Sequence, residues 1–399
     1  MPGFETFGKE EKDQLSEIME TGILMRYNFD NQRNNKWKAR EWEESIQEKI
    51  QIKHAHLTSS GTTALITAVK ALGLGAGDEI ILPPFTFVAS VEALLFCGVI
   101  PVFADIDETL TLSPESVRKA ISPRTKAIMP VHMCGGMADL DPLMQIAKEN
   151  DIFLIEDACQ SIGGTYKNQY LGTLGDIGCF SFDFVKTVTS GEGGAVLTQN
   201  SSVYEFCHQF SDHGHDHLGN DRGAERHPII GLNFRISELQ AAVGLAQWKK
   251  LDEILNRQRK IKSIIKNELR QISEIKFRKF PDESGDNGSF LSIFLPEEDM
   301  TRKVVADLKS EGIPCAYWFD NNWHYIKKWD HFKNLKKDKS LYAEFRDLLP
   351  DYENQDFSIS DEIISRTITF PVSLRTSEEK AKELGQKIAQ IIVNQYNKN

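Results

Sequence analysis

The chain has 399 residues, 40% of them hydrophobic and 26% charged, which is the ordinary mixture of a soluble globular protein with enough sequence for two domains. Its formal net charge of −11 disfavours nucleic acid or an anionic membrane as the partner, although a local basic patch could override this average. The six cysteines form no CxxC pair, so they indicate reduced thiols rather than a disulfide framework.

Neither the N-terminal stretch nor the apolar runs predict a targeting or membrane segment. The stretch MPGFETFGKEEKDQL carries acidic charges and lacks the long apolar centre of a signal peptide. The longest apolar run, at about residues 93–103, is too short to cross a bilayer and contains Gly98 and Pro101. We therefore expect a cytoplasmic protein.

The first part of the chain alternates between strand and helix patterns. Charged helical patterns at residues 9–21 and about 37–50 precede this alternation. The predicted strands are 54–58, 79–82, 101–104, 127–131 and 152–156, and the predicted helices are 62–72, 87–96 and about 139–149. Short strands separated by helices of about ten residues predict a parallel α/β sheet.

The pattern changes after residue 165. The segments GDIGCFSF and GAVLTQ predict strands joined by a loop, a helix begins at 203–210, and a loop rich in Gly, Asp and His covers 211–230. A long helical pattern at 237–269 is of a length that often bridges two domains. Strand-like segments then mix with helices, which predicts a small α+β domain. We expect a large domain at 1–250 and a small one at 251–399.

The stretch SFDFVKTVTSGEGG, residues 181–194, contains one lysine directly after an apolar run. An unpaired ammonium is costly to bury, and burial lowers its pKa toward a neutral amine. Such an amine can attack a carbonyl carbon and form a Schiff base, which makes Lys186 a candidate catalytic residue. The alternative is that Lys186 extends from a loop into solvent.

The motif SSGTTAL, residues 59–65, joins a strand to a helix. The backbone N–H groups and hydroxyls of Gly61, Thr62 and Thr63 could surround an anion at the positive end of this helix. An ordinary Ser/Thr helix cap would look the same. The string GLGAGD at 73–78 resembles a dinucleotide loop, but it follows a helix and precedes a strand, the reverse of the required order. We therefore exclude Rossmann-type NAD binding.

The motif IEDACQSIGG places Asp157 and Gln160 just past the end of an apolar strand. Ligands of open α/β sheets bind at that edge. A carboxylate there could hold a protonated ring nitrogen through a charge-assisted hydrogen bond. A helix cap at Asp157 is the alternative.

Two charged stretches give weaker indications of function. The string SDHGHDHLG alternates three histidines with other residues, but without a cysteine or a second ligand cluster we predict no metal site. We interpret it as a substrate or interface loop. The lysine-rich run at 327–339 is typical of a solvated helix face, and attraction of an anionic substrate is the minority interpretation.

Five motifs in order resemble the DegT/DnrJ/EryC1/StrS sugar aminotransferases. They are SSGTTAL, PPFTFVAS, EDACQSIGG, SFDFVKTVTSGEGG and GLNFRISELQAAVG, and the resemblance covers the chain to about residue 250 and continues more weakly beyond it. The resemblance implies a fold type I, aspartate-aminotransferase-like PLP-dependent transferase: a mostly parallel α/β large domain plus a smaller α+β domain. The implied cofactor is pyridoxal 5'-phosphate (PLP).

The resemblance also implies roles around the cofactor ring. Lys186 is expected to form the Schiff base with PLP and to act in catalysis. Asp157 is expected to keep the pyridine nitrogen protonated, so that the ring acts as an electron sink. Gln160 would bind the ring hydroxyl, and Phe87 would stack on the ring face.

The phosphate roles follow in the same way. Thr62, Thr63 and Ser181 are expected to hold the phosphate. Asn233, in GLNFR, is expected to reach the phosphate from a neighbouring subunit, which implies a homodimer with shared active sites. Two positions depart from the family: many relatives have histidine at Asp183 and alanine at Cys159. A dehydratase branch replaces the lysine with histidine, so Lys186 favours transamination.

Within the family, several strings are most similar to the branch that aminates the C8 aldehyde of oxidised Kdo, the lipopolysaccharide sugar. These strings include RYNFD, VHMCG, FSDHGHDHLGNDRGAERHPIIGLNFRISE and NNWHYIKKW. This resemblance implies transfer from L-glutamate to give 8-amino-3,8-dideoxy-manno-octulosonate in the cytoplasm. Because that acceptor carries a carboxylate, we expect His213, His215 and Arg235 to contact it. The alternatives are a nucleotide-linked keto-sugar acceptor, or a PLP-fold regulator without turnover.

Overall fold

The computed structural model describes residues 3–219, 221–339 and 341–397, and a seven-stranded sheet lies at its centre. The strand order is β1-β9-β8-β5-β4-β2-β3. The bounds are β1 (His54–Thr58), β2 (Glu79–Leu82), β3 (Ile100–Phe103), β4 (Thr125–Ile128), β5 (Phe153–Asp157), β8 (Ile177–Ser181) and β9 (Gly194–Thr198). Neighbours from β3 to β8 pair in parallel, whereas β9 pairs antiparallel with both β8 and β1. The predicted α/β fold with a mostly parallel central sheet is confirmed.

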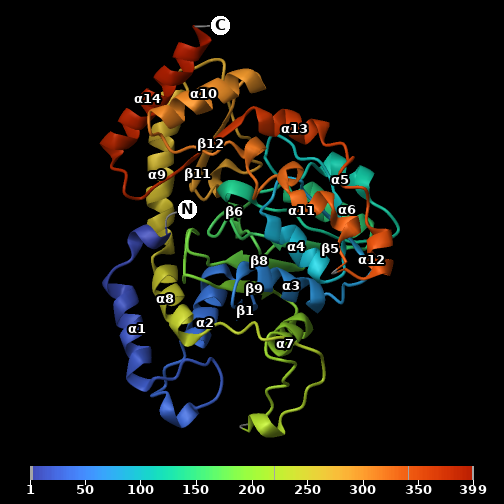
Figure 1. The fold of residues 1–399 in the computed structure, drawn as a ribbon. Helices are drawn as coiled ribbons and strands as arrows, with labels where there is room; N and C mark the ends of the chain where they lie inside the picture. Colours follow the sequence, from blue (N-terminus) through green and yellow to red (C-terminus); the bar gives the residue numbers. More distant parts are fainter. Residues whose placement is uncertain (1–2, 220, 340, 398–399) are drawn as a thin grey trace.

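Both faces of this sheet are covered. The helices of this part are α1 (Lys9–Thr21), α2 (Lys38–Ile50), α3 (Gly61–Ala71), α4 (Val88–Phe96), α5 (Pro114–Ala120), α6 (Leu140–Glu149) and α7 (Ser201–Phe210), and Figure 1 shows several of them packed around the strands. Consecutive residues of β2 belong to different core clusters, Ile80 to one and Ile81 to the other. Side chains alternate along a strand, so such a split requires a buried core on each face.

The helix α5 is absent from the expectation drawn from the sequence. Its start signal is nevertheless present, because Ser113 caps the helix by accepting a hydrogen bond from the backbone N–H of Ser116, and Pro114 occupies the first turn. The helix is short and only Val117 in it is buried, so its apolar periodicity is weak.

The prediction of one long helix at 237–269 is wrong. The structure has two helices, α8 (Glu238–Lys249) and α9 (Leu251–Leu269), which meet at Lys250 with φ −90° and ψ −2°. α8 packs closely on α2: a Cβ built on Gly244 would lie 2.0 Å from the Trp42 ring. α9 continues along one side of the molecule and packs on α14 (Glu378–Tyr396) (Figure 1).

The C-terminal part builds a second core. Strands β10 (Lys276–Phe277), β11 (Phe290–Phe294) and β12 (Thr367–Pro371) form an antiparallel sheet, and α9, α10 (Glu298–Ser310) and α14 share its core. A short hairpin, β6 (Thr165–Tyr166) and β7 (Gln169–Tyr170), and helices α11 (Asp330–Lys333), α12 (Ala343–Leu348) and α13 (Ser358–Ser365) complete the elements. The α+β character is as predicted.

The segment from about residue 326 to 357 returns to the large sheet instead of joining this second core. The Tyr352 ring lies 5.7 Å from that of Phe103, and its hydroxyl donates to the carbonyl of Pro101 at 2.7 Å. The division at 1–250 and 251–399 therefore stays a prediction, since part of the second range packs on strands of the first.

Candidate active site

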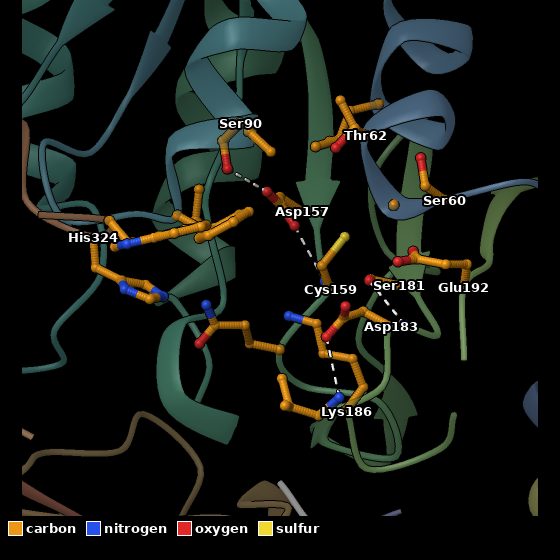
Figure 2. A pocket seen from close by; sticks show the side chains of 18 of the residues that line it. Ser60, Thr62, Ser90, Asp157, Cys159, Ser181, Asp183, Lys186, Glu192 and His324 are labelled. Carbon is orange, nitrogen blue, oxygen red and sulfur yellow. Dashed lines mark hydrogen bonds between the residues drawn. The ribbon is translucent and has the colours of Figure 1, made fainter. Parts of the chain in front are cut away.

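A cavity of about 580 Å³ opens where β5 and β8 end at their carboxyl edge. Figure 2 shows side chains from several motifs meeting there. The predicted residues that line it are Gly61, Thr62, Phe87, Asp157, Gln160, Ser181 and Lys186. Because parallel strands present their carboxyl ends at one edge, motifs that are far apart in sequence come together.

Lys186 lies in the loop that joins β8 to β9. Its backbone N–H donates to the carbonyl of Asp183 at 3.0 Å, and its carbonyl accepts from the N–H of Gly3 at 2.9 Å. The half-buried side chain extends into the cavity (Figure 2). No described residue forms an ion pair with its amine. The lysine is therefore held by its backbone while its amine stays available to a ligand.

Asp157 is the last residue of β5 and is 3% exposed. Its carboxylate accepts from the hydroxyl of Ser90 at 2.6 Å and from the N–H of Cys159 at 3.1 Å (Figure 2). Among the described residues it has no cationic partner. A buried carboxylate without a cation is costly, so this group fits a positively charged ligand atom in the cavity.

Gln160 presents a donor to the cavity. Its side-chain oxygen accepts from the backbone N–H of Cys134 at 3.2 Å, and therefore its NH2 group is the end left for a ligand. Phe87 also lines the cavity, and its ring stacks on Trp323 at 5.8 Å with an interplanar angle of 16°.

The N-terminus of α3 forms a corner of the cavity whose backbone N–H groups suit an anion. Gly61 packs so tightly on β8 that a Cβ there would lie 2.7 Å from the Cβ of Ser181. This close approach places the helix N-terminus beside the Ser181 hydroxyl, where backbone N–H groups favour an anion. Thr63 does not line the cavity, because it forms a capping box: it donates its N–H to the Ser60 hydroxyl and accepts the Ser60 N–H. Its phosphate role stays a prediction.

A second wall of the cavity was missed by the sequence reasoning. It consists of Phe290, Trp318, Trp323, His324 and Pro371, all from the C-terminal part of the chain. Burial, followed by the charge of Lys186, lowers the pKa of His324 to about 4, so this imidazole is neutral at pH 7. For two of these five residues, Trp323 and His324, the available signal is the aromatic run NNWHYIKKW, which marks an unusual segment without indicating where it packs.

Two acidic side chains complete the lining. Asp183 and Glu192 lie on either side of the Lys186 loop and both line the cavity. Burial, followed by the negative charge of Asp183, raises the pKa of Glu192. Asp183, where the family resemblance implies histidine in many members, thus places a carboxylate in the cavity wall.

Comparison with known proteins identifies the family. A model of the DegT/DnrJ/EryC1/StrS aminotransferase family matches residues 6–389. The chain belongs to this family. GDP-perosamine synthase of Escherichia coli O157:H7 is 36% identical over 310 residues, which are 77% of this chain and 82% of that protein. The chain is accordingly an aminotransferase.

Solved structures agree with this fold. The aminotransferase from Psychrobacter cryohalolentis has a TM-score of 0.84 at 25% identity and covers 98% of both chains. NtdA from Bacillus subtilis, solved with the cofactor PMP, has a TM-score of 0.78 at 23% identity and covers 98% of this chain and 82% of its own. The fold of this family member is thus that of the PLP-dependent aminotransferases.

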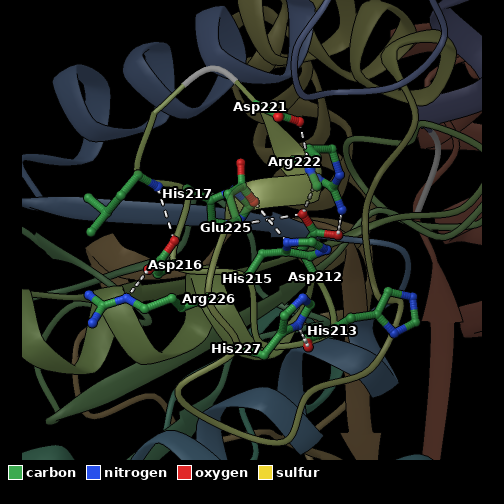
Figure 3. A network of polar contacts seen from close by, with 12 residues as sticks. Asp212, His213, His215, Asp216, His217, Asp221, Arg222, Glu225, Arg226 and His227 are labelled. Carbon is green, nitrogen blue, oxygen red and sulfur yellow. Dashed lines mark hydrogen bonds and ion pairs between the residues drawn. The ribbon is translucent and has the colours of Figure 1, made fainter.

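A separate polar network lies after α7, and Figure 3 shows the predicted residues His213 and His215 in it. Arg235 pairs with Asp212 at 2.5 Å, and His215 lies 2.8 Å from the carboxylate of Glu225. Burial alone would raise the pKa of Asp212, but hydrogen bonds from Arg222 and Arg235 lower it to about 2. Asp212 thus pairs with two arginines of this network, Arg222 and Arg235.

None of these loop residues lines the cavity of the same chain. His213 and Asn233 are exposed, and the loop after α7, described at residues 211–219 and 221–230, extends below α7 (Figure 1). The role of Asn233 as a phosphate contact from a neighbouring subunit stays a prediction, and so do the roles of His213, His215 and Arg235 as substrate contacts. Over the described residues, no group of three or more potential ligands could hold a metal ion, and no helix is long and apolar enough to cross a membrane.

Proposed function

We propose that the chain is a PLP-dependent sugar aminotransferase that uses L-glutamate as the amino donor. One observation carries this proposal: a buried carboxylate, Asp157, and an unpaired amine, Lys186, face one cavity beside a helix N-terminus. PLP offers a cationic ring nitrogen, an aldehyde carbon and a phosphate, and these three groups match those three features.

The residues present fit the cofactor in detail. Thr62, the N-terminus of α3 and Ser181 would hold the phosphate. The Gln160 NH2 would donate to the ring hydroxyl, which is an acceptor when ionised. Asp157, which lacks a cation among the described residues, would bind the ring nitrogen. Phe87 supplies an apolar face at the cavity wall.

The mechanism follows from what these side chains do. When bound, PLP supplies an electron sink for the carbon that loses its proton. Lys186 would hold the cofactor covalently until the donor arrives, then take the proton from the donor carbon and return it to the cofactor side. Asp157 would keep the ring nitrogen of the cofactor protonated, and therefore positively charged, throughout. The second half-reaction reverses these roles on the acceptor carbonyl, and the net change is glutamate to 2-oxoglutarate and carbonyl to amine.

For the acceptor we propose the C8 aldehyde of oxidised Kdo, giving 8-amino-3,8-dideoxy-manno-octulosonate for lipopolysaccharide synthesis. Support comes from the strings that carry this resemblance. NNWHYIKKW supplies Trp323 and His324 to the cavity wall, and the FSDHGHDHLGNDRGAERHPIIGLNFRISE string forms the charged loop of Figure 3. A carboxylated sugar needs cations, and the described residues that line this cavity include two basic side chains, Lys186 and His324, the first of which is proposed to hold the cofactor.

A homodimer would supply further cations. We propose that the loop of a second copy brings His213, His215, Arg235 and Asn233 to this cavity, so that the active sites are shared. We place the enzyme in the cytoplasm, where its six free cysteines would stay reduced.

A nucleotide-linked keto-sugar is the second candidate acceptor. The observation that favours it is the 36% identity to GDP-perosamine synthase, an enzyme named for a nucleotide-linked amino sugar. A diphosphate, like a carboxylate, would depend on cations from the second copy.

The test supplies L-glutamate with each acceptor in parallel and measures 2-oxoglutarate. The Kdo aldehyde should give turnover and GDP- or UDP-linked keto-sugars should give little. Turnover of a nucleotide-linked keto-sugar alone would overturn the Kdo assignment and leave the transamination intact. A purified protein without a visible cofactor band after incubation with PLP would overturn the enzyme proposal and favour a regulator.

A further inference from the structure

Arg278 is a buried arginine with no acidic partner. It is 3% exposed and follows β10 in the C-terminal part of the chain. No described carboxylate forms an ion pair with it, and burial lowers its pKa. A buried guanidinium without a counter-ion is costly and needs other acceptors to compensate for lost water.

Those acceptors are backbone carbonyls of the large sheet's loops. Arg278 donates to the carbonyls of Thr109 at 2.7 Å, Met133 at 2.7 Å and Cys134 at 3.3 Å. Two of the three belong to the turn at residues 132–136, which we call the 132–136 turn. The planar fork of arginine reaches neighbouring carbonyls in a way that lysine cannot reproduce.

The 132–136 turn is constrained on every side. Cys134 has φ 53°, in the left-handed region that L residues rarely adopt. A Cβ on Gly136 would lie 2.4 Å from the Arg278 guanidinium carbon. On the opposite side, His132 accepts from the N–H of Ala138 through Nδ1 and therefore donates through Nε2 to the buried Glu156 at 3.0 Å.

Besides the backbone bond from the His132 N–H to the Asp157 carbonyl at 3.0 Å, one contact of this turn holds a side chain that lines the cavity. The N–H of Cys134 donates to the side-chain oxygen of Gln160 at 3.2 Å. An amide side chain can rotate and exchange its two ends, and this contact fixes the end that faces the cavity as the NH2 donor. The orientation of Gln160 thus depends on a backbone N–H whose own peptide is held by Arg278.

We propose that Arg278 is a positioning residue for the cofactor, acting through the 132–136 turn and Gln160. The guanidinium fixes the Cys134 peptide, the peptide fixes the Gln160 amide, and the amide presents its donor to the ring hydroxyl of PLP. The C-terminal part of the chain is thereby connected to the proposed cofactor ring through three groups: the guanidinium, the peptide and the amide. This inference rests on the proposed function, since it needs PLP in the cavity.

The test is a double-mutant cycle on PLP affinity, measured by equilibrium titration of the bound cofactor's absorption. Arg278→Lys keeps the charge but loses the fork, and it should weaken PLP binding about tenfold, the loss expected for one good hydrogen bond. Gln160→Leu should weaken it by a similar factor. In the Gln160→Leu background, Arg278→Lys should weaken PLP binding by less than about a further twofold, because its effect on the cofactor passes through Gln160.

The controls separate positioning from general loss of stability. Leu308→Ala opens a cavity in the C-terminal core and should lower Tm while leaving PLP affinity within about twofold. If Arg278→Lys fails to fold, Gly136→Ala pushes on the same guanidinium and should reproduce the affinity loss. Additive effects of Arg278→Lys and Gln160→Leu, or an unchanged affinity in Gly136→Ala, would overturn the proposal. Failure of the wild type to bind PLP would instead overturn the proposed function.

Discussion

Replacing Asp157 by asparagine tests the electrostatic part of the site without changing its shape. Asp157 accepts from the N–H of Cys159 through Oδ1 and from the hydroxyl of Ser90 through Oδ2. In the variant, the oxygen can keep the Cys159 contact, while the new NH2 donates to Ser90. The Ser90 hydroxyl can then turn toward Thr86, whose hydroxyl already lies 2.7 Å away. The asparagine therefore keeps hydrogen-bond partners in this site, and the main change is the loss of the carboxylate's negative charge.

The size of the effect follows from that charge. An ion pair at about 4 Å is worth about 4 kcal/mol at the effective dielectric constant of a protein interior, which corresponds to about a thousandfold in rate. We expect Asp157→Asn to bind PLP nearly as well as wild type but to convert L-glutamate about a thousandfold more slowly in a single-turnover assay that follows the cofactor band.

Ser90→Ala is the matched control, because it removes one hydrogen bond to the same carboxylate and keeps the charge. It should slow the half-reaction about ten- to a hundredfold, since one hydrogen bond to a charged group contributes about 1.5–3 kcal/mol. The reasoning would be refuted by an Asp157→Asn enzyme within tenfold of wild type, or by a Ser90→Ala enzyme as slow as Asp157→Asn.

Three further predictions concern other residues of the site and the fold. Lys186→Ala should retain the cofactor only non-covalently and lose at least about a thousandfold in turnover, which reductive trapping with borohydride followed by mass spectrometry would check against wild type. Gly61→Ala places a Cβ 2.7 Å from Ser181 and should weaken phosphate-dependent binding, so PLP affinity should fall while pyridoxal affinity stays nearly constant. Burial, followed by the charge of His217, lowers the pKa of His208 to about 3, so the folded protein keeps it neutral while the unfolded chain takes up a proton below about pH 6.5. Stability should therefore fall as pH drops from 7 to 5, by up to about 2 kcal/mol from this residue, and His208→Gln should lose less over that range in urea unfolding at fixed protein concentration.

The strand ends explain why part of the site could be predicted from the sequence. Asp157 and Ser181 each end an apolar strand, and carboxyl ends of parallel strands share an edge, so their meeting follows from topology alone. Lys186 follows the second of these strands within a few residues. Local sequence signals, combined with the rule that parallel strands end at one edge of the sheet, were therefore sufficient to predict that these side chains meet.

Other features depend on contacts between distant segments. Trp323 and His324 reach the cavity because the chain returns to the large sheet after building a separate core, and no local pattern indicates that return. The break at Lys250 was missed for a different reason. Lysine is a good helix former, so neither propensity nor periodicity marks the position where α8 ends. Thr63 shows a third limit, because the same hydroxyl serves a helix cap or a phosphate equally well.

The two walls of the cavity come from different stretches of the chain. The groups proposed to hold the cofactor lie between residues 61 and 186, whereas the aromatic wall comes from residues 290–371. Substitutions at Trp318 should therefore alter the space left beside the cofactor groups from the C-terminal side of the cavity. Trp323 and His324 also lie against the Phe87 ring, at 5.8 Å and 5.3 Å, so changes at these two positions should reach the proposed cofactor side as well.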